Sequence, residues 1–300
     1  MKPSPNIWIN GKIAPISKGK ILSFHQGLNY GACVYEGIRC YKTDQGTAVF
    51  RLKEHIDRLF YSASVLNMNI GFTKAQVEQA VLDIIRKNKI TSGYIRPIAF
   101  YSEPKMGINI LDSEVTFMIL TWPWNDAKPV GATTLSIPKY RRLSPAAIDI
   151  RAKISGYYAN GLLGFIEAKK AGSDLPLFLD EKGFLTESSI SNFFIAKGKT
   201  LYTPTTRNIL NGITRDTVIS IASDLKLKVV EKDIRPDFLK NADEVFLTGT
   251  GIQLQSVKEV KNHFSLKKDP VITNSINEYY KRISTGKVAK YKKWLTFATG

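Results

Sequence analysis

Short apolar stretches separated by turn residues open the chain and predict two hairpins. The dipeptide Asn10-Gly11 lies between two such stretches and is typical of a two-residue hairpin turn. Apolar stretches at 39–41 and 47–50 flank a segment rich in turn-forming residues, which predicts a second hairpin. The chain therefore begins with antiparallel strands.

Segments with helical periodicity follow these hairpins. Over residues 52–66, apolar side chains recur at intervals of three and four, which predicts a helix. Thr73 begins another helix, because Gln76 three residues later completes a capping box. Apolar runs at 94–101 and 115–121 predict two further strands.

Proline, glycine and charged residues gather at 123–133 and predict an interdomain loop between domains at 1–122 and 134–300. In the second domain we expect helices at 157–171, 213–225 and 271–283, short antiparallel strands at 175–180, 184–186, 192–196 and 201–202, and further strands at 227–230 and 245–248. Strands and helices mix without regular alternation, which favours an α+β class over a doubly wound parallel sheet.

Composition agrees with a two-domain globular protein. The chain has 300 residues, of which 43% are hydrophobic, enough for two buried cores. Its longest apolar stretch, 115–124, is about half of what a membrane helix needs, and no signal segment precedes the first predicted strand. We therefore expect a soluble cytoplasmic protein. Cys33, Cys40 and the scattered histidines match no zinc pattern, so no metal site is predicted.

The formal net charge of +17 is the one unusual bulk property. Basic proteins often bind nucleic acid or anionic membranes. Here the excess is spread over both halves and lacks an accompanying platform of aromatic residues. A lysine-rich solvated surface is the favoured explanation, and neither nucleic acid nor membrane is an expected partner. Such a surface also attracts phosphates and carboxylates.

Two glycine turns and two arginines are candidate anion sites. Residues 210–215 place a glycine before a predicted helix, where backbone N–H groups and the helix dipole can bind phosphate. Residues 248–251, Thr-Gly-Thr-Gly, allow close backbone approach to an anion, although an ordinary turn is the alternative at both places. Arg39 and Arg96 lie on apolar strands and need either a carboxylate ligand or an internal salt bridge. These features suit a phosphorylated cofactor and a carboxylate substrate, but they identify no catalytic lysine.

Seven motifs then occur in a recognisable order. They are Tyr30-Gly31 with residues 35–41, residues 54–59, 94–97, 152–160, 185–188 with 192–194, 210–215 and 248–251. In this order they resemble the class IV aminotransferase family, closest to bacterial branched-chain aminotransferases, and the resemblance runs from Trp8 to about Trp294. It implies pyridoxal-5′-phosphate (PLP) fold type IV, with a small α/β sandwich domain and a larger pseudo-barrel α+β domain.

The resemblance also implies roles toward PLP. Lys153 would hold the cofactor as a Schiff base and, once displaced by substrate, would shuttle the proton. Glu187 would face the pyridine nitrogen and keep it protonated, and Tyr158 would bond the phenolate oxygen. The remaining cofactor residues would be Arg58, Ile213, Thr214 and Thr250 at the phosphate, together with Leu210.

A pocket with an apolar side that also accepts glutamate is implied for the substrate. Tyr94 and the backbone of Thr250-Gly251 would receive the α-carboxylate. Arg96, helped by Tyr30 of the partner subunit, would meet the side-chain carboxylate of glutamate. The other implied substrate residues are Tyr35, Gly37, Arg39, Met106, Ile108 and Trp124. Ala127 departs from the pattern, because some bacterial members have a tyrosine there.

The implied activity is transfer of the amino group of leucine, isoleucine or valine to 2-oxoglutarate by a ping-pong mechanism, with glutamate formed. D-amino-acid aminotransferase, R-selective amine transaminase and aminodeoxychorismate lyase are alternatives in the same family. A basic nucleic-acid-binding protein is the non-enzyme alternative. The motifs at 36–39 and 94–96 favour the branched-chain enzyme. A homodimer or homohexamer, with the active site near the dimer interface, is also implied.

Overall fold

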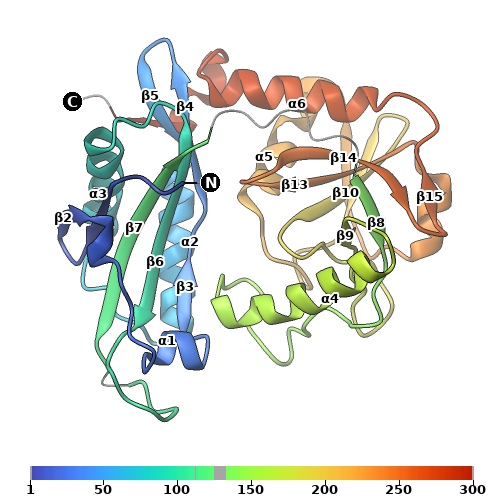
Figure 1. Cartoon of the computed structure of the whole chain (residues 1–300). Helices are drawn as coiled ribbons and strands as arrows, with labels where there is room; N and C mark the ends of the chain where they lie inside the picture. Colours follow the sequence, from blue (N-terminus) through green and yellow to red (C-terminus); the bar gives the residue numbers. More distant parts are fainter. Residues whose placement is uncertain (1, 112, 125–132, 299–300) are drawn as a thin grey trace. The chain divides into compact units, whose positions relative to one another are not determined.

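The computed structural model describes residues 2–111, 113–124 and 133–298. By its internal contacts the chain divides into two compact units (Figure 1). Unit 1 comprises Met1–Asp126, Ala152–Gly156 and Arg282–Gly300, and unit 2 comprises Ala127–Arg151 and Tyr157–Lys281. Each unit has its own sheet and helices.

Unit 1 is built on an eight-stranded antiparallel sheet. Its strands are β1 (Asn6–Ile9), β2 (Lys12–Pro15), β3 (Cys33–Tyr35), β4 (Ile38–Thr43), β5 (Gly46–Phe50), β6 (Gly93–Tyr101), β7 (Val115–Pro123) and β16 (Leu295–Phe297). They follow the order β16-β5-β4-β6-β7-β1-β2, and β3 also pairs with β6. The predicted hairpins are confirmed: β1 pairs with β2 through Asn10 and Gly11 at φ 43° and 92°, and β4 pairs with β5.

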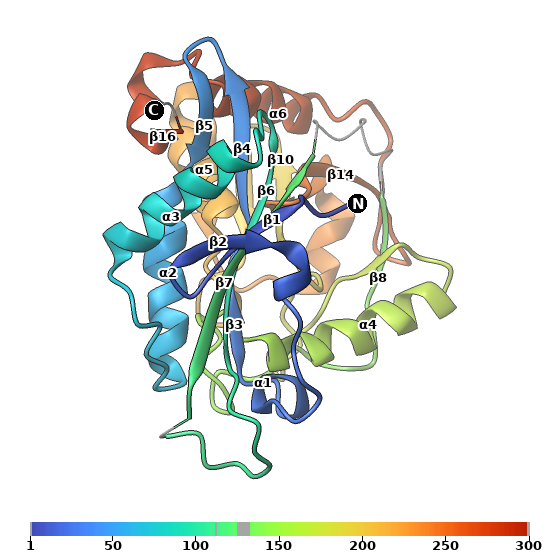
Figure 2. The ribbon, with the colours of Figure 1, turned by 60° about the vertical axis from the view of Figure 1, so that its left-hand side comes forward.

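Helices α2 (Leu52–Val65) and α3 (Lys74–Lys87) lie side by side against this sheet, and both views agree on their arrangement (Figure 2). The predicted capping box is confirmed, because Thr73 Oγ1 accepts from the Gln76 N–H and Gln76 Oε1 accepts from the Thr73 N–H. Ile56 and Ile84, on the apolar faces of these helices, are fully buried. A short helix, α1 (Gln26–Asn29), precedes β3.

Unit 2 has a mixed eight-stranded sheet. Its strands are β8 (Thr133–Ser136), β9 (Leu175–Pro176), β10 (Asn192–Lys197), β11 (Thr200–Thr203), β12 (Lys228–Glu231), β13 (Glu244–Gly249), β14 (Gln253–Val260) and β15 (Phe264–Ser265). The order is β12-β11-β10-β13-β14-β8-β9, with β15 beside β14. Its core includes Phe193, Val245 and Val257, all fully buried.

Two helices of unit 2 have an end that a neighbouring group stabilises, and a third follows a glycine turn. Helix α4 (Tyr158–Lys170) stops before Gly172, whose φ of 70° is the left-handed conformation that ends helices. Helix α6 (Val271–Ser284) begins at the buried carboxylate of Glu244, which accepts from the N–H groups of Ile272 and Thr273. Helix α5 (Ile213–Ala222) follows the glycine turn at Gly212.

Two strand predictions were wrong in this unit. The predicted strand at 175–180 is regular only at Leu175–Pro176 and pairs with β8 in parallel, not antiparallel. Residues 184–186 form only an isolated bridge, Leu185 to Leu179. The physical reason is the turn between them, where Asp180 Oδ1 accepts from two backbone N–H groups and bends the chain. The α+β class itself is confirmed by the mixed elements and two sheets.

The compact units differ from the predicted domain ranges in two segments. The chain around Lys153 belongs to unit 1, because the Lys153 carbonyl accepts from the Tyr35 N–H. The C-terminal segment also belongs there, because β16 pairs with β5. Most of the predicted loop at 123–133, including Ala127, lies outside the described residues, and the boundary there stays a prediction. Within the described part of the chain, no helix has the length and apolar character needed to cross a membrane.

Candidate active site

Lys153 is held in unit 1 by its main chain. Its N–H donates to Ser62 Oγ at 2.8 Å, and its carbonyl accepts from the Tyr35 N–H at 3.3 Å. The flanking Ala152 and Ile154 are both 3% exposed. These contacts fix the backbone on both sides of the lysine, while the residue itself is half-buried. The Lys153 Nζ atom lies 4.6 Å from the centroid of the Tyr35 ring.

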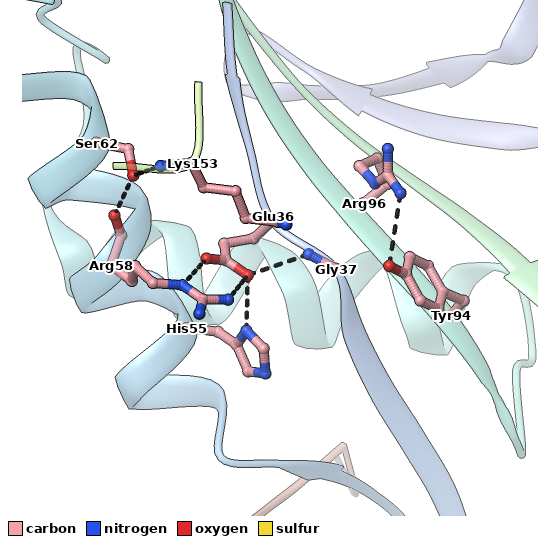
Figure 3. A network of polar contacts seen from close by, with 8 residues as sticks. All are labelled: Glu36, Gly37, His55, Arg58, Ser62, Tyr94, Arg96 and Lys153. Carbon is pink, nitrogen blue, oxygen red and sulfur yellow. Dashed lines mark hydrogen bonds and ion pairs between the residues drawn. The ribbon is translucent and has the colours of Figure 1, made fainter. Parts of the chain in front are cut away.

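Arg96 approaches the same tyrosine ring. Its guanidinium carbon is 4.5 Å from the Tyr35 centroid and 5.5 Å from that of Tyr94, within the range of cation–π attraction. Arg96 Nη2 also lies 3.5 Å from the Tyr94 hydroxyl (Figure 3). Gly37 makes room for that hydroxyl, since a Cβ at position 37 would stand 1.8 Å from it. Unit 1 thus combines aromatic surface with two cations around Tyr35.

Arg39 lies opposite Tyr94 in the pairing of β4 with β6. It is 1% exposed, its Nη2 donates to the Trp124 carbonyl at 3.1 Å, and its guanidinium carbon lies 5.2 Å from the Tyr41 ring and 5.1 Å from the Trp124 ring. The Trp124 ring in turn lies 5.3 Å from that of Tyr94. Arg39 therefore holds Trp124 beside the aromatic group.

Arg58 of α2 is bonded to a carboxylate that the sequence did not single out. Its Nε donates to Glu36 Oε1 at 2.5 Å and its Nη2 to Glu36 Oε2 at 2.9 Å. Burial on its own would raise the pKa of Glu36, but Arg58 and the bond from His55 outweigh burial and hold that pKa below its usual range. Burial lowers the pKa of His55. At neutral pH we therefore treat Glu36 as ionised and His55 as a neutral donor.

In unit 2, the buried carboxylate of Glu187 likewise accepts hydrogen bonds from several neighbours. The residue is 3% exposed, and Arg142 donates to Oε1 through Nε at 2.9 Å and Nη2 at 2.8 Å. Asn192 donates to Oε2 at 3.0 Å, and the Leu210 N–H donates to Oε1 at 3.3 Å. A second amide, Asn160, accepts from Arg142 at 3.3 Å. A buried carboxylate with these donors is fixed in place.

Asn192 brings three sequence motifs together. It bonds Glu187 and also donates to the Leu210 carbonyl at 2.9 Å. Its Oδ1 would lie 1.9 Å from a Cβ at Gly212, so that glycine is required at the start of α5. Asn192 also pairs with Thr248 in the register of β10 and β13, near the end of β13 that leads into the turn at 250–252. The acidic motif and both glycine turns therefore meet.

These residues fit the implied cofactor. The ionisable, buried Glu187 suits a protonated ring nitrogen. In the part of the chain that the structure describes, no side chain caps the N-terminus of α5, whose N–H groups suit a phosphate. Nearby hydroxyls of Ser188, Ser191 and Thr248 are buried and have no hydrogen-bond partner among the described residues.

The sequence-predicted site residues fall into groups. In unit 1 the described contacts bring together Tyr35, Gly37, Arg39, Arg58, Tyr94, Arg96, Trp124 and Lys153. In unit 2, the Leu210 N–H bonds Glu187, Ile213 and Thr214 are the first residues of α5, and Thr250 and Gly251 follow β13. Tyr158 is the first residue of α4. Tyr30, Met106 and Ile108 are instead exposed, at 46%, 57% and 85%, and no described contact joins them to the Tyr35 group.

Sequence reasoning missed Ser62, Glu36 and His55 as partners of the predicted residues, and it missed Arg142 altogether. Ser62, Glu36 and Arg142 each bond a predicted residue or its backbone, and His55 bonds Glu36. Glu36 and His55 lie inside two of the seven motifs, at 35–41 and 54–59. A polar or charged residue within an apolar run was the feature of the sequence that could have singled them out. Arg142 follows Arg141 in a turn-rich segment, where nothing in the sequence pointed to Glu187.

Comparisons with known proteins agree with this geometry. The amino-transferase class IV family model matches residues 33–260. The chain is 34% identical to the branched-chain-amino-acid aminotransferase of Pseudomonas aeruginosa, with 97% of this chain and 96% of the relative covered, and 33% identical to that of Escherichia coli K12, with 98% and 97% covered. The branched-chain aminotransferase structure from Thermoproteus uzoniensis with norvaline has a TM-score of 0.93 at 34% identity, covering 99% and 100% of the two chains. The chain belongs to the class IV aminotransferase family.

Proposed function

We propose that this chain is a PLP-dependent branched-chain amino-acid aminotransferase. It moves the amino group of leucine, isoleucine or valine to 2-oxoglutarate, by a ping-pong mechanism that forms glutamate. The observation on which the proposal rests is the group around Tyr35, where aromatic rings and the Arg96 guanidinium share one surface. An apolar side chain can pack on the rings and an anionic one can pair with the cation. The cytoplasm stays the predicted location.

Solved relatives support a pocket of this dual kind. The T.th. branched-chain amino acid aminotransferase has been solved with 4-methylvaleric acid and with N-(5′-phosphopyridoxyl)-L-glutamate. The latter structure has a TM-score of 0.94 at 35% identity, covering 99% of both chains. The first ligand has a branched apolar chain and the second has the side chain of glutamate. We infer that the pocket of the present chain accepts the same two classes.

In unit 1, Lys153 provides the amine that links to the cofactor. When bound, PLP supplies the electron sink that stabilises charge at the substrate Cα. Once displaced by substrate, the Lys153 amine would serve as the base that moves the substrate Cα proton. Tyr94 receives the α-carboxylate, together with the backbone of Thr250 and Gly251. Trp124, Tyr35 and the buried Arg39 shape the apolar side.

In unit 2, Glu187 holds the proton of the pyridine nitrogen. Arg142 and Asn192 hold its carboxylate in place by direct hydrogen bonds. Tyr158 bonds the phenolate oxygen. Arg58 of unit 1, and in unit 2 the N–H groups of Ile213 and Thr214 and the Thr250 hydroxyl, would hold the phosphate, because helix N-termini and guanidinium groups are suited to anions.

A panel of amino donors with 2-oxoglutarate tests this function. We expect leucine, isoleucine and valine to support rapid glutamate formation. D-alanine and (R)-1-phenylethylamine should support far less, and aminodeoxychorismate should release no pyruvate. A preference for a D-amino acid or an amine would assign the chain to another branch of the family. A colourless purified protein with strongly salt-dependent DNA affinity would favour the nucleic-acid alternative.

Arg96→Met is expected to slow the half-reactions of glutamate and 2-oxoglutarate far more than that of leucine. Glutamate and 2-oxoglutarate would lose their charge partner, and breaking such a pair costs roughly 2–5 kcal/mol, or about 30- to 5000-fold in rate. The leucine half-reaction should change far less, since its side chain needs no cation. Single-turnover absorbance measurements resolve the two halves. Arg86→Met, which removes an arginine paired with Asp83 on the surface of α3, is the control. Equal losses for leucine and glutamate would place Arg96 at the shared α-carboxylate or in a structural role.

A second copy of the chain is proposed to cover an exposed apolar surface of unit 1. The exposed residues are Ile21, Leu22, Phe24, Leu28, Tyr30, Met106, Ile108 and Leu111. They form one patch, because Gln26 donates to the Gly107 and Asn109 carbonyls and the Gly107 N–H donates to the Tyr30 hydroxyl. A patch of this kind marks an interface. In the dimer, Tyr30, Met106 and Ile108 would reach the partner subunit's site.

Replacing this patch with charge is expected to dissociate the dimer. In Leu22→Glu/Ile108→Glu, carboxylates would be buried without partners, at a cost of about 2 kcal/mol or more, so the dissociation constant should rise at least about 30-fold. Analytical ultracentrifugation over a concentration series measures it. Val271→Glu, at an apolar residue of unit 2 that is 69% exposed, is the control. An unchanged dimer in the double variant would place the interface elsewhere.

A further inference from the structure

One turn of α2 joins Arg58, Glu36 and Lys153 in a single set of contacts. Ser62 Oγ donates to the Arg58 carbonyl at 2.8 Å, and the same oxygen accepts from the Lys153 N–H at 2.8 Å. Figure 3 shows these residues beside the Glu36 carboxylate. Arg58 is thereby tied to the backbone of the lysine that we propose to hold the cofactor.

The Glu36 carboxylate has an unusually complete set of donors. Oε1 accepts from Arg58 Nε at 2.5 Å. Oε2 accepts from Arg58 Nη2 at 2.9 Å, His55 Nδ1 at 2.7 Å and the Gly37 N–H at 3.1 Å. The Glu36 and His55 side chains are 0% and 2% exposed, whereas that of Arg58 is 13% exposed. The carboxylate is sealed within the unit and the guanidinium reaches its surface.

The contacts between Glu36 and Arg58 orient the guanidinium more than they stabilise the fold. A buried ion pair contributes little net stability compared with apolar residues of similar size, because both charges lose their water. Two parallel bonds to a carboxylate do fix the plane and direction of a guanidinium. A guanidinium fixed in advance loses less conformational entropy when it binds an anion.

We propose that Glu36, held by His55, is a positioning residue that orients Arg58 for the cofactor phosphate. This inference rests on the proposed function of Arg58 as a phosphate ligand. Glu36 itself touches neither cofactor nor substrate. Its effect should therefore appear in phosphate recognition and should disappear when Arg58 is absent.

Binding of PLP and of unphosphorylated pyridoxal to the cofactor-stripped full chain tests the proposal. Both aldehydes can react with Lys153, and only PLP has the phosphate. We expect Glu36→Gln to weaken PLP binding about 10- to 100-fold and to change pyridoxal binding less than about 3-fold. The PLP-to-pyridoxal affinity ratio is the readout, since general damage to unit 1 would lower both affinities together.

A double-variant cycle separates the proposal from its premise. Arg58→Gln alone should lower the affinity ratio at least as much as Glu36→Gln, and adding Glu36→Gln to it should have no further effect. A further loss in the double variant, or equal losses for PLP and pyridoxal in Glu36→Gln, would overturn the positioning role. An unchanged ratio in Arg58→Gln would instead refute Arg58 as the phosphate ligand, and the positioning role with it.

Two further variants guard against simple misfolding. Glu244→Gln alters another buried carboxylate with several donors, in unit 2 at the start of α6, and should leave the affinity ratio unchanged. If Glu36→Gln does not fold by circular dichroism, His55→Phe keeps a ring and removes one donor to Glu36. The ratio should then fall about 3- to 10-fold, and an unchanged ratio in this variant would overturn the proposal.

Discussion

Lys153→Ala is expected to give a folded chain that binds PLP without a covalent bond and has almost no transaminase activity. The contacts that hold this segment are made by main-chain atoms, the N–H to Ser62 and the carbonyl to Tyr35, so alanine preserves them. The side chain, however, is proposed to supply both the covalent link and the proton transfer. Loss of the proton-transfer group alone should lower the rate at least about 10²- to 10⁴-fold.

Borohydride reduction followed by mass spectrometry measures the covalent link. In the parent chain, reduction should attach one PLP to the peptide that contains Lys153, and in Lys153→Ala it should attach none. Lys169→Ala is a matched control, because Lys169 is a half-exposed surface lysine paired with Asp174. If reduction still attached PLP stoichiometrically to Lys153→Ala, another lysine would hold the cofactor and the motif match at 152–160 would be wrong.

Local signals in the sequence predicted most of the secondary structure. The Asn10-Gly11 turn and the capping box at Thr73 are both in place. Each depends on the conformational preference of one or two residues, which neighbouring sequence alone determines. These elements could therefore be predicted without knowing what packs against them.

Strands defined by distant partners were harder to predict. Strand β14 mixes Gln253, Gln255 and Lys258 with its apolar residues and was missed, although it pairs with both β13 and β8. Its central place in the sheet comes from those neighbours rather than from its own composition. The same reason explains why β16, near the end of the chain, was not assigned to the first domain.

The site residues were predicted from the family resemblance, not from composition. Spacing alone gave the anion-binding character of Gly212 and the need of Arg39 and Arg96 for partners. It could not give Arg142, because a salt bridge between residues 45 positions apart leaves no periodic signal. Nor could it show that Arg39 would pack between aromatic rings against a carbonyl. The fold determines which groups pair with a charged residue, whereas the sequence shows only which charged residues need a partner.

Glu187→Gln is expected to leave PLP bound through Lys153 but to slow removal of the substrate Cα proton about 10²- to 10³-fold. The glutamine has nearly the same shape and can still accept from Arg142. It has no negative charge, so it cannot keep a proton on the pyridine nitrogen, and the ring becomes a poorer electron sink. Exchange of the leucine Cα hydrogen in D₂O measures this step without requiring a complete transamination.

The surroundings of Glu187 make this variant a test of charge rather than of folding. Arg142 and the Leu210 N–H donate to Oε1, and Asn192 donates to Oε2. The glutamine oxygen can take the place of Oε1 and keep the first two bonds, so that only the bond from Asn192 is lost. Asp180→Asn is the matched control, because Asp180 is a buried carboxylate of unit 2 that accepts from backbone N–H groups and from Asn208. Its Cα exchange rate should stay near that of the parent chain. Parent-like exchange in Glu187→Gln itself would mean that the charge facing the ring nitrogen comes from another residue.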